Sequence, residues 1–130
     1  MFNPDPMLVT LLQATVAAGA SDLHLTVGRP PTALRDGVLV PFEGVSLLQP
    51  ADTERIVMSL LNEHQVQELD ENSQVDFSFG LESIGRFRAN AYTQRHSLSL
   101  ALRVIPFRVR SLEELGAPPA AHDLLLKPYG

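Results

Sequence analysis

Apolar and polar side chains alternate along three successive segments of residues 74–105. The first segment alternates as Val75, Asp76, Phe77, Ser78 and Phe79. Side chains of a strand point alternately to its two faces, so this pattern predicts strands with one buried and one exposed face. The expected strands cover 74–79, 86–94 and 98–105, with a hairpin turn at 95–97. Pro106 is expected to end the last strand, because proline cannot donate to a strand ladder.

The first half of the chain combines helical periods with a short hairpin. Asp5 before Pro6 is typical of a helix N-terminus, and Gly19 is typical of a helix end. Asp36-Gly37 supplies the positive φ angles of a tight hairpin turn. Asn62 is a candidate N-cap for a second helix that follows directly on another. The expected helices run from 6 to just before 19, from 50 to 61, and from 62 to about 69. The expected strands cover 21–27, 32–35 and 38–40.

This order of elements predicts an α+β domain. We expect five or six strands in one mixed or antiparallel sheet, with the helices packed on one side. After the last strand, residues 111–116 are expected to form a short capped helical turn, and residues 117–127 to be Pro-punctuated and then helical.

Composition excludes several classes of function. The chain has 130 residues, no Cys and a formal net charge of -5. Disulfides, thiol catalysis and thiolate metal sites are therefore absent, and a cytoplasmic location is expected. Nucleic-acid binding is not expected, because it relies on a net basic surface. The N-terminus has no basic segment of a secretory signal, and no apolar run approaches the roughly 20 residues of a membrane-spanning helix.

Basic charge is concentrated in one arginine-rich segment. Nine of the ten basic residues are Arg, and six of these lie between Arg86 and Arg110, a stretch without Asp or Glu. Arginine presents a rigid fork of donors that suits carboxylate or phosphate. The segment therefore indicates either contact with an anion or arginines that cover apolar surface and pair with nearby carboxylates.

Motifs of a self-sufficient active site are missing. The sequence contains no G-x-x-x-x-G-K-[ST] phosphate loop and no G-x-S-x-G elbow. The four histidines have no second ligand at metal-binding spacing. Asp22 and His24 share one strand face, either as an acid–base pair or as polar residues that face a partner or bond locally. The chain is therefore not expected to be an enzyme or to bind a cofactor by itself.

Six segments in order resemble one family. These are Gly19-Ala-Ser-Asp-Leu-His-Leu25, Gly28-Arg-Pro-Pro31 with Arg35-Asp-Gly37, Val75-Asp-Phe-Ser-Phe79, Gly85-Arg-Phe-Arg-Ala-Asn-Ala-Tyr92 with Gln94-Arg95, Arg103-Val-Ile-Pro106, and Leu112-Glu-Glu-Leu-Gly116. Together they resemble the opening of the PilT-type retraction ATPases of type IV pili. The resemblance implies a PAS-like N-terminal domain at 1–110. Residues 111–130 are then the start of a linker into a RecA-like ATPase domain, with the phosphate loop beyond Gly130.

The same resemblance implies a function in a larger assembly. The parent protein would bind ATP and Mg²⁺ and form a homohexamer at the cytoplasmic base of the pilus. Each N-terminal domain would pack on the ATPase domain of its own and of a neighbouring subunit, next to the inner-membrane platform protein. Two alternatives stay open: the equivalent domain of a PilB- or GspE-type assembly ATPase, and a stand-alone PAS-like sensor of a small ligand.

Four arginines are implied to approach the ATP phosphates: Arg88 and Arg103 first, and then Arg95 and Arg86. Alternation places Arg86 and Arg88 on one strand face, which supports part of this assignment. Arg95 falls on the other face unless the turn reorients it. His96 stands where the family usually has glycine, so the hairpin turn is expected to differ there.

Overall fold

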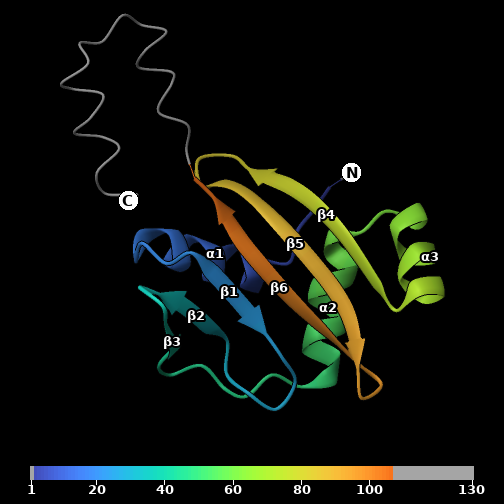
Figure 1. Ribbon diagram of the computed structural model, residues 1–130, viewed down its shortest axis with the longest axis horizontal. Helices are drawn as coiled ribbons and strands as arrows, with labels where there is room; N and C mark the ends of the chain where they lie inside the picture. Colours follow the sequence, from blue (N-terminus) through green and yellow to red (C-terminus); the bar gives the residue numbers. More distant parts are fainter. Residues whose placement is uncertain (1, 107–130) are drawn as a thin grey trace, which may run out of the picture.

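Three helices and six strands follow one another along residues 2–106, the part of the chain that the computed structural model describes (Figure 1). The helices are α1 (Pro6–Ala17), α2 (Pro50–Leu60) and α3 (Glu63–Asn72). The strands are β1 (Asp22–Leu25), β2 (Thr32–Arg35), β3 (Val38–Pro41), β4 (Gln74–Leu81), β5 (Gly85–Gln94) and β6 (Ser97–Ile105).

The six strands form one sheet in the order β3-β2-β1-β6-β5-β4. Every strand pair in the sheet is antiparallel, which confirms the predicted α+β class with its higher strand number. Two hairpin ladders, β1-β2-β3 and β4-β5-β6, join where β1 pairs with β6. Figure 1 shows this join at the centre of the sheet.

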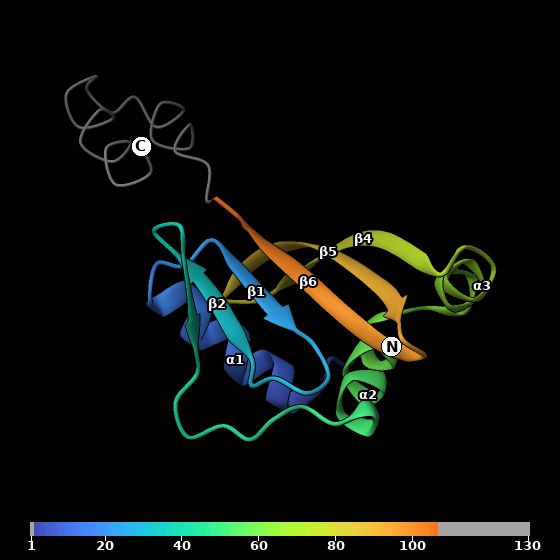
Figure 2. The same cartoon turned by 60° about the horizontal axis from the view of Figure 1, so that its bottom comes forward.

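Two helices cover one face of the sheet, as the sequence predicted. Figure 2 shows α1 and α2 beneath the strands, whereas α3 lies beside the edge strand β4. In the contacts between elements, α2 packs mainly on β6, α3 on β4 and α1 on β1. The opposite face of the sheet carries none of these helices, and we call it the open face.

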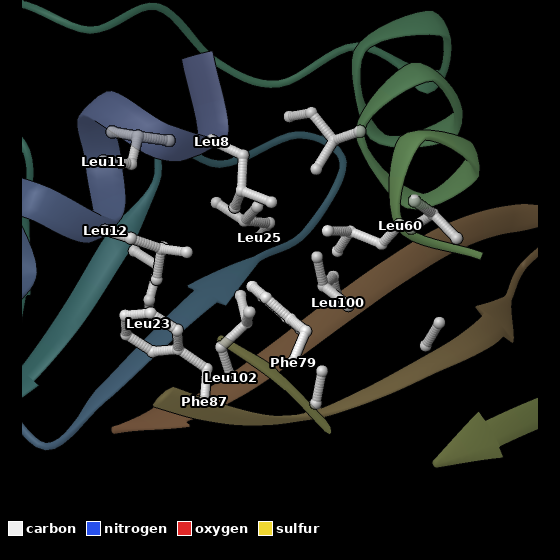
Figure 3. Packing of buried hydrophobic residues seen from close by; sticks show 14 of the residues in the cluster. Leu8, Leu11, Leu12, Leu23, Leu25, Leu60, Phe79, Phe87, Leu100 and Leu102 are labelled. Atoms are coloured by element: carbon white, nitrogen blue, oxygen red, sulfur yellow. The ribbon is translucent and has the colours of Figure 1, made fainter. Parts of the chain in front are cut away.

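The core lies between the covered face and the two helices (Figure 3). Leucines of α1, β1 and β6 meet there, and Phe87 of β5 is fully buried among them. The ring centroids of Phe87 and Phe79 are 5.5 Å apart, and those of Phe79 and Phe77 are 6.1 Å apart. Such aromatic contacts add to the stabilisation that burial alone supplies. The alternating pattern of the sequence therefore predicted the buried face of β4 and β5 correctly.

Asp5 fixes the start of α1 and ties it to α2. Its Oδ1 accepts from the backbone N–H of Met7 at 2.9 Å, as an N-cap does. Its Oδ2 accepts from Arg55 Nε of α2 at 2.7 Å, and its own backbone N–H donates to Ser59 Oγ at 2.9 Å. The sequence predicted the cap, but not the two contacts with α2. Asp5 therefore joins the two helices that cover the sheet.

The α2–α3 junction follows the predicted cap. Asn62 Oδ1 accepts from the backbone N–H of Gln65, and Gln65 Oε1 accepts from the backbone N–H of Asn62. This reciprocal pair is a capping box, which satisfies two backbone donors at the helix start. Helix α3 runs beyond the expected Leu69 to Asn72 and ends at Ser73, whose φ of 63° is left-handed.

Both tight hairpin turns use left-handed backbone. The β2–β3 turn has φ values of 52° at Asp36 and 79° at Gly37. The β5–β6 turn has φ values of 52° at Arg95 and 66° at His96, and Ser97 already belongs to β6. Two-residue turns of this kind require positive φ at both central positions. Glycine supplies one of them in the first turn, whereas the second turn contains none.

Replacing His96 with Gly is expected to stabilise the domain by about 0.5–1 kcal/mol. A left-handed conformation costs a residue with a Cβ roughly 1–2 kcal/mol, from which the greater chain entropy of unfolded glycine must be subtracted. Chemical denaturation measures the change. Ser97→Gly is the matched control, because Ser97 lies inside β6 and its replacement should destabilise. Equal losses from both variants would refute the strain at His96.

Three exposed apolar side chains lie on the edge strand β3. Val38, Leu39 and Val40 are 61%, 55% and 45% exposed. Pro41 ends this strand and removes one donor from its free edge. The helical turns expected at 111–116 and 117–127 lie outside the described residues.

Candidate functional site

The open face of the sheet carries the polar half of each alternating strand. In β5, Phe87, Ala89 and Ala91 are buried against the helices. Arg86 and Arg88 lie between them in the sequence, on the open face, and both are exposed. The face predicted from alternation is therefore the face on which these two arginines lie.

One row of side chains crosses the open face from β1 to β4. In register, Asp22 of β1 lies opposite Arg103 of β6, Arg103 lies opposite Arg88 of β5, and Arg88 lies opposite Ser78 of β4. Residues directly opposite each other in an antiparallel pair have Cα atoms about 4.5–5.5 Å apart. We call Asp22, Arg103 and Arg88 the arginine row. The strand pairing thus brings together the two arginines that the resemblance singled out.

The arginine row contains two like charges and one opposite charge. Arg103 Nε donates to Asp22 Oδ2 at 3.4 Å, and Ser21 Oγ donates to Asp22 Oδ1 at 2.6 Å. The Asp22 side chain is 13% exposed, whereas that of Arg103 is 73% exposed. Like charges directly opposite each other destabilise a sheet. Asp22 offsets part of this repulsion, and among residues 2–106 no salt bridge to Arg88 is present.

Arg86 lies on the same face but leans away from the arginine row. A Cβ built on Gly80 of β4 would lie 3.0 Å from Arg86 Nη1, so the guanidinium of Arg86 covers the backbone of Gly80. Arg86 is also opposite Ile105, the last residue of β6. It therefore borders the row without joining it.

Arg95 is far from the other three arginines. It lies seven residues beyond Arg88 in the sequence, which corresponds to about 24 Å along an antiparallel strand. Its turn is at the lower right of Figure 1, whereas β6 ends at the upper left, near the β4–β5 turn. One phosphate group cannot contact Arg95 and the arginine row together.

A second row, which contains no arginine, lies next to the arginine row. His24, Ala101, Asn90 and Asp76 are opposite one another in that order. Asn90 Nδ2 donates to Asp76 Oδ1 at 2.8 Å.

Since the Asp22 carboxylate accepts from Ser21 and Arg103, the structure favours the local bonding of Asp22 over the acid–base pair with His24.

A groove with a volume of about 620 Å³ lies between the α2–α3 junction and β4. Aromatic and aliphatic side chains line it, among them Phe77, Phe79 and Leu60, together with polar Asn62 and Gln65. Among the described residues that line it, Glu63 is charged and none is Lys, Arg or His. The groove therefore offers no counter-charge to an anionic ligand, in contrast to the open face.

The described part of the chain carries neither a metal-binding cluster nor a membrane-spanning helix. Within residues 2–106, no group of three or more His, Cys, Asp or Glu side chains could hold a metal ion. None of the three helices has both the length and the apolar character needed to cross a membrane.

Two curated relatives from Pseudomonas aeruginosa match most of the chain. The type IV pilus ATPase PilU is 35% identical over 120 residues, which are 92% of this chain and 31% of PilU. The type IV pilus retraction ATPase PilT is 33% identical over 109 residues, which are 84% of this chain and 31% of PilT. The chain thus spans about a third of the length of the relatives it matches.

A solved structure supports the same relationship. The pilus retraction motor PilT with bound ADP matches with a TM-score of 0.74 and 39% identity, over 88% of this chain and 33% of that one. No protein-family model matches the chain. By sequence and by fold, the chain therefore belongs to the PilT-type ATPases of type IV pili, as a domain that corresponds to about a third of a full-length member.

Proposed function

We propose that this chain is the N-terminal nucleotide-sensing domain of a type IV pilus retraction ATPase, and that it presents Arg88 and Arg103 to the phosphates of bound ATP. The observation that carries this proposal is the arginine row. Two exposed arginines lie directly opposite each other with one carboxylate beside them. A phosphate group that approaches the open face would supply the missing negative charge.

Arginine chemistry suits this role. A guanidinium can donate two parallel hydrogen bonds to phosphate oxygens, and such charge-assisted bonds are about twice as strong as neutral ones. Arg103 donates its Nε–H to Asp22, and no hydrogen bond within residues 2–106 uses its two terminal nitrogens. The strands β5 and β6 pair along their whole length, which holds the backbones of both arginines in fixed register.

The four candidate arginines take different parts in this proposal. Arg88 and Arg103 make the phosphate contact, and Arg86 lies at its border over Gly80. Arg95 would need a second anionic group at the other end of the sheet, because about 24 Å of strand separates it from Arg88. The contact with ATP therefore rests on two residues.

The parent protein in this proposal is the enzyme, and the described domain acts on a site built elsewhere. The resemblance implies a RecA-like ATPase domain that binds ATP and Mg²⁺, in a hexamer that works at the cytoplasmic side of the pilus machinery beside the platform protein. The curated relatives named as pilus ATPases and the PilT structure with ADP support this reading. The open face would then pack against an ATPase domain of the same or a neighbouring subunit.

In the full-length ATPase, Arg88→Ala and Arg103→Ala are each expected to lower ATP turnover by roughly 10–100-fold. Charge-assisted hydrogen bonds contribute about 1.5–3 kcal/mol, and each 1.4 kcal/mol corresponds to a tenfold change in rate. Steady-state hydrolysis assays measure the loss. Arg29→Ala is the control, because Arg29 is an exposed arginine in the loop after β1.

Two results would contradict the proposed function. Turnover that stays unchanged in both variants would assign the row to surface ion pairing. An equal loss in Arg29→Ala would show that net charge, and not the arginine row, governs the rate. Thermal unfolding of each variant checks that the domain stays folded.

A further inference from the structure

We infer that Asp22 is an internal competitor of phosphate that holds Arg103 on the sheet until nucleotide displaces it. This inference rests on the proposed function and adds a regulatory residue to the same site. Asp22 is the only carboxylate of residues 2–106 that makes a salt bridge with either arginine of the row. Asp22 therefore already pairs with Arg103, one of the two guanidinium groups that a phosphate would bind.

The geometry of Asp22 suits a holding role. Its side chain is 13% exposed and is fixed on one side by Ser21 Oγ at 2.6 Å. Its other oxygen accepts from Arg103 Nε at 3.4 Å, a long contact for a charge-assisted hydrogen bond. The fixed carboxylate restrains the Arg103 guanidinium through this hydrogen bond. Because the hydrogen bond is long, breaking it costs little free energy. Arg103 itself is 73% exposed, so it is free to turn outward.

The two arginines of the row therefore differ before any anion binds. Arg88 has Ser78 and Arg103 as its neighbours in register and no salt bridge within the described residues. It is ready to receive an anion, while Arg103 must first exchange Asp22 for that anion. Such an exchange sets a threshold: phosphate binds Arg103 only when it outcompetes the carboxylate.

The first test measures binding of inorganic triphosphate to the 130-residue chain at low ionic strength, where exposed charges are screened least. Asp22→Asn keeps the size of the side chain and the acceptor for Ser21 but removes the negative charge. We expect the dissociation constant for triphosphate to fall roughly three- to tenfold, because Arg103 no longer has to exchange its ion pair with Asp22 for the anion. Asp36→Asn is the matched control, because Asp36 lies in the β2–β3 turn without a salt bridge to the arginine row.

A double-mutant cycle tests whether Asp22 acts through Arg103. In the Arg103→Ala background, Asp22→Asn is expected to change triphosphate affinity by less than about twofold, since coupled residues lose their interaction when one is removed. An equal gain in both backgrounds would show that only the net charge matters, and it would overturn the inference.

NMR of the unmodified chain supplies a second readout that needs no variant. The Nε–H resonance of Arg103 and the carboxyl carbon resonance of Asp22 are expected to shift together on addition of triphosphate, as their contact breaks. An Asp22 carboxyl resonance that does not move while triphosphate saturates the site would overturn the inference.

The outcomes separate this inference from the proposed function. If Arg88→Ala and Arg103→Ala leave triphosphate binding unchanged, the proposed function fails, and the inference fails with it. If both arginine variants lose binding but Asp22→Asn does not tighten it, the phosphate role stands and the competitor role of Asp22 falls.

Discussion

Phe87→Ala is expected to lower the free energy of unfolding by about 3–5 kcal/mol, the range for removing a fully buried aromatic ring. Phe87 is 0% exposed and lies near the start of β5, where its ring meets Phe79 at 5.5 Å between centroids. Since whole domains are stable by only about 5–15 kcal/mol, this single change removes a large part of the stability. Urea denaturation followed by circular dichroism measures it.

The neighbouring residue gives a sharp control for this loss. Arg88 is next to Phe87 but points to the open face and is exposed, so Arg88→Ala should change stability by less than about 0.5 kcal/mol. If Arg88→Ala destabilised the domain as much as Phe87→Ala, the arginine would have to be a structural residue. A loss of ATP turnover in Arg88→Ala would then reflect a destabilised domain and not a missing phosphate contact.

Asp5→Ala is expected to cost about 2–3 kcal/mol of stability, which is the second largest effect. The change removes the N-cap of α1, worth about 0.5–2 kcal/mol, and also the ion pair with Arg55. The hydrogen bond and the charge of Asp5 raise the pKa of Arg55, which marks their attraction. The side chain of Asp5 is 9% exposed and that of Arg55 is 51% exposed, so water screens part of the pair. Thermal unfolding at neutral pH measures the cost.

Asp5→Asn separates the two contributions of this residue. Asparagine caps helices about as well as aspartate but carries no charge for Arg55. Its cost should therefore be clearly smaller than that of alanine, and a cost equal to that of alanine would assign the whole effect to the ion pair. Arg55→Met removes the same ion pair and also the contact of Arg55 Nη1 with Asp52 Oδ1 at 3.3 Å, so its cost should be at least that of Asp5→Asn.

Local rules predicted the fold closely because the chemistry of each element is local. The alternation in residues 74–105 set the buried face of β4 and β5, and Asp36-Gly37 identified the β2–β3 turn. Asp5 and Asn62 were recognised as caps from their positions alone. Each of these signals depends on residues at most four positions apart.

Long-range contacts could not be predicted from the sequence. Asp22 meets Arg103 across 81 residues, and Asp5 meets Arg55 across 50. Both pairs depend on which strands are neighbours and on their register, and no local period fixes either quantity. The family resemblance likewise grouped Arg95 with the other arginines, whereas the length of β5 separates them. Asp22, Arg88 and Arg103 were each named from the sequence, but their alignment in one row and the pairing of Asp22 with Arg103 were not predicted.

The join between β1 and β6 has a consequence for synthesis of the protein on the ribosome. β1 obtains its first partner, β2, as soon as residue 35 is made, but its second partner is the last strand, which ends at Ile105. Until that strand has left the exit tunnel, the leucines of β1 lack the neighbours that β6 supplies, Leu100 and Leu102. The nascent chain must therefore hold the three-stranded ladder β1-β2-β3 without β6 while residues 42–105 are added, with α1 as the earlier element that packs on β1. Pauses in elongation before β6 has left the exit tunnel would prolong this state, and pauses after that point would not.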